Sequence, residues 1–429
     1  MPTVWLSRAH IAAGDPETRG RAQPGAGSGY IEGVATMDWE RIAADTPGAE
    51  GQVFLDSAGS SLAPTPVLDI VIGHLRREAE IGGYQAANER AADLDRVKVS
   101  LGALLGAQPS SIALADSASR AWTQVFYAVP LRSGDRILLS GVEYASNAVA
   151  ALQRARACGA VVEVVPSDPT GQIDLDALAG LLDERVRILS LVHVPTNGGL
   201  VNPVREVVEL AHAYGTFVLL DACQSVGQLR VDATELGVDA LSGTGRKWLR
   251  GPRGTGFLYV RPDLISSLEP PVIDLHSAAW SSEDSYVLRE DATRFELWER
   301  DVAAHLGLGA AVDYLLGLGI DEVQKAIADR AGQLREALGE IPQVHLHDLG
   351  RQQCGIVSFS VDGIEPAVVR DTLADQGITV TVSRSTSTPL DMQSRGLAAV
   401  VRASPHYFVR PDQLGSALTV IAAIAAPHR

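Results

Sequence analysis

The sequence is short of cysteine, of lysine and of long apolar runs. Its 429 residues include three cysteines, too few for a disulfide framework, so we expect a reducing, cytoplasmic compartment. No apolar run approaches the ~20 residues that a membrane-spanning helix needs, so no membrane partner is predicted. The formal net charge of −16 and a pI of about 5.1 argue against a nucleic-acid partner, whose phosphates such a surface would repel. No metal site is predicted.

Lysine is scarce although arginine is abundant, and the three lysines are Lys98, Lys247 and Lys325. A lysine at a motif position therefore stands out against this background. The hydrophobic fraction of 46% is ordinary for a globular enzyme. The length suggests two or three domains, at ~100–200 residues per domain.

Residues 1–36 differ in composition from the rest, being rich in Gly, Pro, Ala and Arg without sustained periodicity. They lack the apolar core of a signal peptide, so we predict a disordered extension or a start site assigned too early, with Met37 as a natural beginning. Residues 37–65 are predicted to join a small domain formed mainly by residues 292–429. Residues 66–291 are predicted to form the large domain.

Apolar periodicity from about residue 66 to residue 260 alternates between strand-like and helical spacing. Strand-like runs occur at 136–140, 161–165, 187–193 and 217–221, and helical runs occur at 67–80, 147–158, 175–182 and 204–214. The alternation predicts a doubly wound α/β domain with a mostly parallel sheet. Ligands of such sheets bind beyond the carboxyl ends of the strands, so chemistry is expected at the strand-to-helix turns.

Two of these turns carry residues with a chemical use. Ser117, Ala118 and Ser119 precede a helical run, where free N–H groups and the helix dipole favour a phosphate; an ordinary serine cap is the alternative. Asp221 ends an apolar strand, and a buried carboxylate needs a partner such as a pyridinium nitrogen. A helix-capping aspartate is the alternative there.

A third turn, within residues 241–260, holds Lys247 among glycines that let the backbone bend tightly. A partly desolvated lysine beside a cation loses basicity and becomes a better nucleophile toward an aldehyde. Arg246 could be that cation, a phosphate ligand, or both. The alternative for the whole segment is a basic surface loop.

Taken together and in this order, the motifs resemble those of the aminotransferase class V family of pyridoxal 5'-phosphate (PLP) enzymes. The run TGRKWLRGPRGTGFLYV at 244–260 carries the resemblance most specifically, and the match extends from Asp38 to the end of the chain. It implies a fold-type I architecture, with a large doubly wound domain and a smaller α+β domain, and PLP held by Lys247. The other cofactor-binding residues that it implies are Ser117, Ala118, Ser119, Tyr144, Thr196, Asn197, Asp221, Gln224, Thr244 and Arg246. Ala58, Gly59 and Arg402 are implied to bind an amino-acid substrate, Arg402 through its α-carboxylate.

Two positions depart from the family pattern. Tyr144 replaces the histidine of the Glu-His-x-x-Asn motif at 143–147, which preserves an aromatic face for stacking but changes any proton transfer. The Arg-x-Glu-Gly-Thr segment reads Arg-Phe-Glu-Leu-Trp at 294–298. The resemblance implies a phosphate contact from the Gly-Thr of the neighbouring subunit, and the absence of Gly-Thr here puts that contact in question.

The cysteines bear on the reaction. Cysteine desulfurases of this family need a nucleophilic cysteine on a mobile loop before the carboxylate-binding arginine, and the corresponding stretch 383–396 has none. Cys158 and Cys354 are expected to be structural, and Cys223 is expected to lie under the cofactor ring beside Asp221. Persulfide chemistry is therefore not the favoured prediction.

Segments 55–62, 82–84, 244–260 and 294–299 are together similar to the C–S lyases of ergothioneine biosynthesis in actinobacteria. The similarity implies β-elimination from hercynylcysteine sulfoxide to a sulfenate, pyruvate and ammonia, with Lys247 as the base. Tyr84 is among the aromatic residues, with Trp280, Tyr286 and Trp298, that could face the substrate's quaternary ammonium. Alternatives are a cysteine desulfurase or selenocysteine lyase-like enzyme, an aminotransferase, a racemase, or a non-catalytic PLP-fold binding protein. Relatives build the site at a two-fold interface, so a homodimer is predicted.

Overall fold

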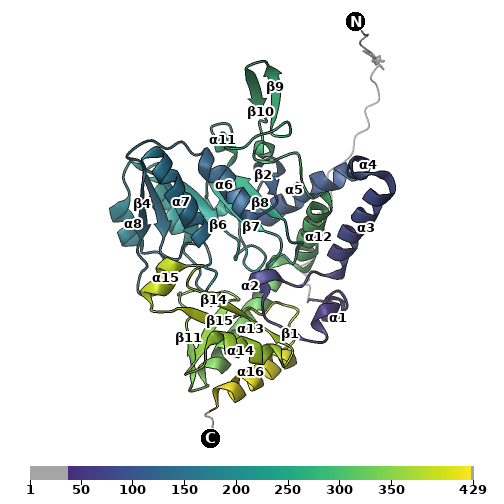
Figure 1. Ribbon diagram of the computed structural model, residues 1–429, viewed down its shortest axis with the longest axis vertical. Coiled ribbons are helices and arrows are strands. Elements are labelled where there is room, and N and C mark those ends of the chain that lie inside the picture. Colours follow the sequence, from purple (N-terminus) through teal and green to yellow (C-terminus); the bar gives the residue numbers. More distant parts are fainter. Residues whose placement is uncertain (1–36, 427–429) are drawn as a thin grey trace, which may run out of the picture. The chain divides into compact units, whose positions relative to one another are not determined.

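A seven-stranded sheet organises the first half of the chain in the computed structural model, which describes residues 37–426 (Figure 1). Its strand order is β2-β8-β7-β6-β5-β3-β4. Six strands run in the same direction, and β8 runs opposite to them. The strands are β2 Ile112–Ala115, β3 Arg136–Ser140, β4 Val161–Val165, β5 Val186–Val192, β6 Phe217–Asp221, β7 Ala240–Thr244 and β8 Gly256–Val260. The prediction of a mostly parallel sheet is confirmed.

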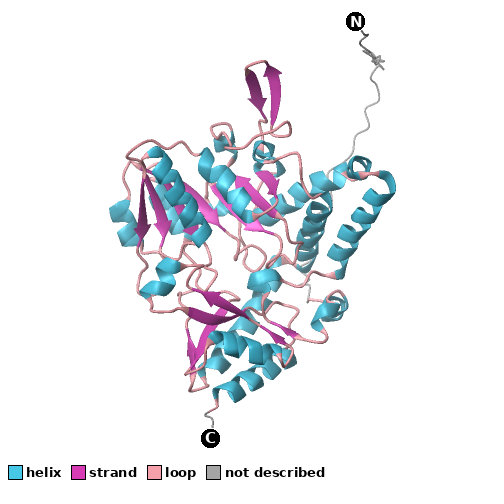
Figure 2. Cartoon of the chain, viewed as in Figure 1, coloured by secondary structure: helices cyan, strands magenta, loops and turns pink. Residues whose placement is uncertain are grey.

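Two separate apolar cores lie on the two faces of this sheet, because successive side chains of a strand point to opposite faces. Ile137 and Leu139 of β3 join one core, whereas Leu138 joins the other. Helices cover both faces, as the coloured elements of Figure 2 show. The first core is closed by α6 Ala118–Ala128 and α7 Ala145–Cys158, and the second by α8 Leu175–Leu181 and α9 Val204–His212.

A helical group precedes the first strand of the sheet, with α3 Thr65–Ile81, α4 Gly83–Glu89 and α5 Ala91–Leu105. The later helix α12 Val302–Leu318 packs against α3 and α5. The sequence placed α12 in the C-terminal domain. The described residues 37–426 form one compact unit, so the predicted boundaries at 65 and 291 stay a prediction. The predicted extension 1–36 lies outside the described residues.

The C-terminal part forms a four-stranded antiparallel sheet in the order β11-β12-β15-β14. Its strands are β11 Val344–Leu346, β12 Val357–Val361, β14 Thr381–Arg384 and β15 Ala399–Ala403. The helices packed on it are α13 Ile320–Gly339 and α14 Pro366–Ala374, and α16 Pro411–Ala425 packs against these two helices. The N-terminal strand β1 Val53–Phe54 pairs in parallel with β13 Ile378–Thr379, so the segment before α3 joins this part.

The hairpin of β9 Ala278–Ser282 and β10 Ser285–Leu288 extends from the body of the chain (Figure 1). The remaining short helices are α1 Trp39–Ala44, α2 Ser57–Ser60, α10 Ala233–Leu236, α11 Pro262–Ile265 and α15 Pro389–Ser394, with 3-10 turns at Pro47–Ala49, Pro109–Ser111 and Ala292–Phe295. Within residues 37–426, no single helix has the length and apolar character to cross a membrane. The bent pair of α12 and α13 meets that criterion on length and composition alone.

Candidate active site

A cavity of about 790 Å³ that opens to solvent lies at the carboxyl ends of β3, β5, β6 and β7. This is the place where doubly wound sheets bind their ligands. Its wall contains ten of the eleven residues predicted to bind the cofactor: Ser117, Ala118, Ser119, Tyr144, Thr196, Asp221, Gln224, Thr244, Arg246 and Lys247. Wall residues to which the sequence analysis assigned no role of their own are Asp116, Trp122, Asn147 and Thr255, among others. The individual roles stay predictions.

Lys247 lies in the turn between β7 and β8, which is closed by hydrogen bonds from Arg250 N to Lys247 O and from Gly251 N to Gly245 O, at 3.0 and 2.8 Å. Burial lowers the pKa of Lys247. The neighbouring Arg246 also lowers it, while the charge of Asp221 acts in the opposite direction. A lowered pKa increases the fraction of neutral amine, which is the form that attacks an aldehyde.

Arg250 fixes this turn to two distant parts of the chain. Its guanidinium is buried and donates to Leu62 O at 2.8 Å, to the hydroxyl of Tyr407 at 2.7 Å and to Thr46 Oγ1 at 2.6 Å. Its φ of 61° is the one positive value at a non-glycine residue among those described, and such backbone strain persists only where the surroundings enforce it. This anchoring role of Arg250 was not predicted from the sequence.

The first turn of α6 forms the part of the cavity wall where the cofactor's phosphate is predicted to bind. Backbone N–H groups in a first turn have no intrahelical acceptor and are free to bind an anion. Ser117 Oγ also caps the helix by accepting from Arg120 N at 3.2 Å, so the serine cap and the cavity wall coexist. A Cβ at Gly256 would lie 2.3 Å from the backbone carbon of Ser117, so only glycine lets β8 pass this close.

Asp221 ends β6 and is buried in the cavity wall. It accepts hydrogen bonds from Asn147 Nδ2 and from Cys223 N, both at 3.0 Å. These two donors fix the carboxylate without neutralising it, because neither is a cation. A fixed, buried anion at this position fits the predicted contact with a pyridinium nitrogen.

Gln224 and Thr196 are joined on the opposite side of the cavity. Gln224 Nε2 donates to Ala58 O at 3.0 Å and to Thr196 Oγ1 at 3.3 Å, and its Oε1 accepts from Trp248 Nε1 at 2.9 Å. Asn197 is the predicted cofactor residue that does not line the cavity. Its amide donates instead to Asp391 Oδ2 of α15, at 2.7 Å.

Arg402, the predicted carboxylate anchor, is buried and already holds partners. It donates to Thr196 O and Oγ1 at 2.9 and 3.0 Å, and it forms an ion pair with Asp56 at 2.9 Å. Burial lowers the pKa of Arg402 and raises that of Asp56. A substrate carboxylate at Arg402 would therefore share its guanidinium with Asp56, a contact that sequence reasoning missed.

The other predicted substrate residues are divided between the cavity region and the surface. Ala58 is buried, and its N–H donates to Ser404 Oγ at 3.0 Å. Gly59 O accepts a hydrogen bond from the Arg246 guanidinium, which lines the cavity. Tyr84 of α4 is 79% exposed and does not line the cavity.

The three thiols occupy different environments. Cys354 is buried, as predicted, and burial raises its pKa to about 11. Cys158 ends α7, away from the cavity wall. Cys223 lines the cavity, and burial, with the charge of Asp221 as a second cause, raises its pKa well above the usual range, so it is held as the thiol.

Glu143 lies directly before the cavity residue Tyr144 and is only 1% exposed, although no separate role was predicted for it. Its Oε1 accepts from Tyr144 N at 2.9 Å and from Asn147 Nδ2 at 3.0 Å. Burial raises the pKa of Glu143 to about 8, and the charge of Asp221 adds to the shift. A signal was present in the sequence, because Glu143 and Asn147 are the first and last residues of the motif at 143–147.

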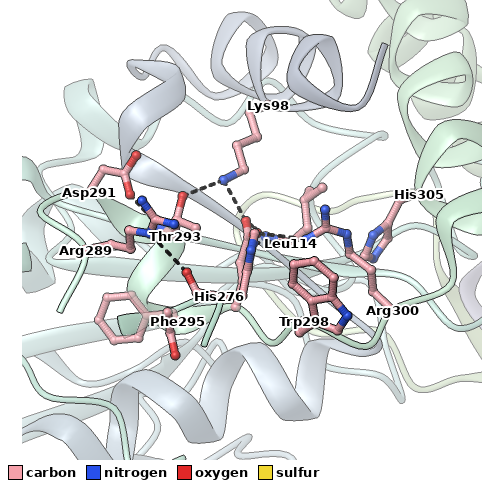
Figure 3. Close-up of polar contacts among 12 residues, drawn as sticks. Lys98, Leu114, His276, Arg289, Asp291, Thr293, Phe295, Trp298, Arg300 and His305 are labelled. Atoms are coloured by element: carbon pink, nitrogen blue, oxygen red, sulfur yellow. Dashed lines mark hydrogen bonds and ion pairs between the residues drawn. The ribbon is translucent and has the colours of Figure 1, made fainter. Parts of the chain in front are cut away.

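A second buried glutamate, Glu296, belongs to the segment that departs from the family pattern. Lys98 of α5 reaches this segment, with its Nζ 2.7 Å from Glu296 Oε1 and 2.9 Å from Thr293 Oγ1 (Figure 3). Glu296 also accepts from Leu114 N of β2 at 2.9 Å and lies 3.0 Å from His276 Nε2. Burial opposes ionisation, but the hydrogen bond from His276 and the charge of Lys98 lower the pKa of Glu296 to about 2.

The chain is similar to known proteins over most of its length. It matches the family model described as aminotransferase class-V over residues 53–414. It is 29% identical over 397 residues to a probable cysteine desulfurase of Methanothermobacter thermautotrophicus, covering 90% of this chain and 98% of the other. A probable cysteine desulfurase of Halobacterium salinarum is 27% identical, covering 90% and 96%.

Solved structures share the same fold. The apo structure of a cysteine desulfurase from Thermococcus onnurineus NA1 has a TM-score of 0.83 with 24% identity, covering 91% of this chain and 98% of the other. A complex of the cystine C–S lyase C-DES with its product cysteine persulfide has a TM-score of 0.79 with 24% identity, covering 88% and 99%. The predicted fold-type I architecture is confirmed.

Proposed function

We propose that this chain, which belongs to the aminotransferase class-V family, cleaves the carbon–sulfur bond of a cysteine-derived amino acid by β-elimination. The family is PLP-dependent, and the cavity fits that cofactor. Lys247 would bind its aldehyde, the first turn of α6 its phosphate, and Asp221 its ring nitrogen. The free N–H groups of the turn and the fixed buried anion support this fit.

Each residue contributes a separate part of the reaction. Bound PLP supplies an electron sink for bond cleavage at the substrate's Cα. Lys247, whose pKa burial lowers, offers a neutral amine that can take up the Cα proton. Arg402 would hold the α-carboxylate through charge-assisted hydrogen bonds. The Cβ–S bond then breaks with its electron pair on sulfur, and the three-carbon fragment is hydrolysed to pyruvate and ammonia.

The observation that carries elimination rather than desulfuration is the position of the thiols. Segment 383–396 contains no cysteine, and it is held in place by hydrogen bonds from Ala145 N to Ser387 O at 2.9 Å and from Asn197 to Asp391. Among the described residues, Cys223 alone places a thiol in the cavity wall, and its raised pKa disfavours the thiolate. A substrate sulfur that leaves without attack by the enzyme, as a sulfoxide's sulfenate does, suits this arrangement.

A second candidate function, cysteine desulfuration, has direct support from the relatives. Those from Methanothermobacter and Halobacterium are both called probable cysteine desulfurases. In that reaction the sulfur passes to an enzyme thiol and alanine is released. Cys223 is the thiol that would have to receive it, since neither Cys158 nor Cys354 lines the cavity.

Hercynylcysteine sulfoxide is the narrower substrate that we propose, and it rests on the resemblance of the four segments 55–62, 82–84, 244–260 and 294–299. An aromatic face would suit its trimethylammonium group. Tyr84 and Trp280 are 79% and 81% exposed and do not line the cavity of their own protomer. They could reach a substrate only from a second copy, so the proposal includes a homodimer.

The test measures the products from cysteine, cystine, an S-alkylcysteine sulfoxide and hercynylcysteine sulfoxide. We expect pyruvate and ammonia, fastest from hercynylcysteine sulfoxide, and little alanine from cysteine. Lys247→Ala should abolish product formation and the PLP–lysine adduct that borohydride traps, whereas Lys325→Ala, the matched control, should keep both. Cys223→Ala should retain elimination. Alanine and persulfide formed from cysteine, and lost in Cys223→Ala, would establish the desulfurase instead.

A further inference from the structure

Two buried carboxylates share one amide beneath the cavity. Asn147 Nδ2 lies 3.0 Å from Glu143 Oε1 and 3.0 Å from Asp221 Oδ2. An amide nitrogen carries two hydrogens, so each carboxylate can receive one. The bridge joins α7 to the end of β6, across 74 residues of sequence. It places a second acid, which the proposed reaction does not use, one side chain away from the anion that faces the cofactor's ring nitrogen.

The surroundings of Glu143 do not compensate a charge. Tyr144 and Asn147 face it from its own segment, Asp221 from β6 and Ser190 from β5. Within residues 37–426 it forms no salt bridge, in contrast to the buried carboxylates Glu296 and Asp239, which each pair with a cation. Its Oε2 is buried without a hydrogen bond of good geometry, and the neighbouring hydroxyl of Ser190 lowers the pKa of Glu143 only partly against the effect of burial.

Glu143 and Asp221 are both buried and share a single amide, so the negative charge of one carboxylate opposes the ionisation of the other. Asp221 has a donor on each oxygen, the amide of Asn147 and the N–H of Cys223, whereas both hydrogen bonds of Glu143 reach the same oxygen, Oε1. The proton of the pair therefore resides on Glu143. This agrees with its pKa, which burial raises to about 8.

We infer that Glu143 is a positioning residue for the cofactor: as an uncharged acid it shares the amide of Asn147 with Asp221 and leaves Asp221 as the charged partner of the ring nitrogen. When Glu143 loses its proton, the added negative charge raises the affinity of that ring nitrogen for its own proton. The inference rests on the proposed cofactor site but not on the choice of substrate. It assigns to Glu143 a control over the electron-withdrawing strength of the bound cofactor.

The test uses holoenzyme loaded with PLP that is isotopically labelled at its ring nitrogen. The NMR shift of that nitrogen should change in the wild type with a midpoint near pH 8. Glu143→Gln mimics the uncharged acid and keeps an acceptor for Asn147, so its holoenzyme should show no transition there and should hold the low-pH shift throughout. Glu184→Gln, at an exposed glutamate, is the matched control and should keep the transition. An identical transition in wild type and Glu143→Gln would overturn the inference.

A second measurement uses only the wild-type protein, so it does not depend on whether a variant folds. Infrared difference spectra of the wild-type holoenzyme across the same pH range should show one buried protonated carboxyl being lost with a midpoint near pH 8. Absence of that signal would also overturn the inference. A wild-type chain that binds no PLP at Lys247 would instead overturn the proposed cofactor site, so the two failures are distinguishable.

Discussion

Glu143 and Glu296 are buried to nearly the same degree, at 1% and 4% exposure, yet burial leads to opposite protonation states. Glu143 sees an amide, a backbone N–H and another carboxylate, and its pKa rises to about 8. Glu296 sees Lys98, His276 and the N–H of Leu114, and its pKa falls to about 2. The difference shows that the neighbours, rather than burial, decide whether a buried glutamate keeps its charge.

The two glutamates also belong to different tasks. The group around Glu296 joins segment 292–300 to α5 and β2, so its charge stabilises the fold. Glu143 lies against the cavity wall, where, by our inference, an uncharged acid would leave Asp221 as the one anion facing the cofactor. A buried acid without a cation is costly for the fold, and such acids cluster where function requires them. Each of the following predictions changes one side of this contrast.

The largest expected effect is on the pH dependence of stability. Because the folded state raises the pKa of Glu143 from 4.5 to about 8, folded protein binds more protons than unfolded protein between those values. Stability is therefore lost as pH rises through this window, by on the order of 5 kcal/mol at ~1.4 kcal/mol per pKa unit. Glu143→Gln should lack this loss. Urea unfolding at intervals from pH 5 to about 9 measures it, and parallel curves for the two proteins would contradict the assignment.

The next largest effect on stability is expected when the charge of Glu296 is removed. Its dependence on pH has the opposite sign to that of Glu143, because stability is lost as pH falls. Glu296→Gln leaves Lys98 without its anion, and breaking a buried ion pair on one side costs about 3–5 kcal/mol at neutral pH. The wild-type stability that Glu296 provides is present above pH 4.5 and is lost as pH falls toward about 2. Glu299→Gln, at an exposed glutamate three residues on, is the control and should unfold like wild type.

A double-mutant cycle isolates the Lys98–Glu296 pair from the rest of its group. Lys98→Met and Glu296→Gln should each destabilise, but the double variant should cost less than the two single effects added together. The reason is that the second substitution removes a group already left unpaired. We expect a coupling free energy of about 1–3 kcal/mol from urea unfolding of the four proteins. Additive effects would mean that His276 and Arg300, rather than Lys98, keep Glu296 ionised.

Sequence reasoning succeeded where the chemistry is local. The strands at 136–140, 161–165 and 217–221 have the predicted bounds, and Lys247 lies in the predicted turn at the cavity. Asp221 follows the same logic, because an acid that ends a parallel strand must lie at the ligand-binding edge. Each of these predictions needed only the spacing of neighbouring residues.

What the sequence could not supply is contact across long separations. Arg402 and Asp56 form an ion pair across 346 residues of sequence. Asn197 donates a hydrogen bond to Asp391, 194 residues away, instead of lining the cavity as its motif predicted. The sign of the pKa shift at Glu143 or Glu296 likewise depends on which distant side chain packs beside it. Such pairings are set by how the strands and helices pack and leave no periodic trace in the chain.

The smallest expected effect concerns Lys325, the lysine that pairs on the surface. Its Nζ lies 2.8 Å from Asp329 one helical turn away, nearly as close as Lys98 lies to Glu296, but both side chains are mostly exposed. Water screens such a pair, and holding two long side chains together costs entropy, so exposed pairs contribute little. Lys325→Ala should leave the urea midpoint unchanged, whereas Lys98→Ala should lower it clearly. Equal shifts for the two lysines would show that distance alone sets the strength of these pairs, and the contrast between the buried glutamates would then need another cause.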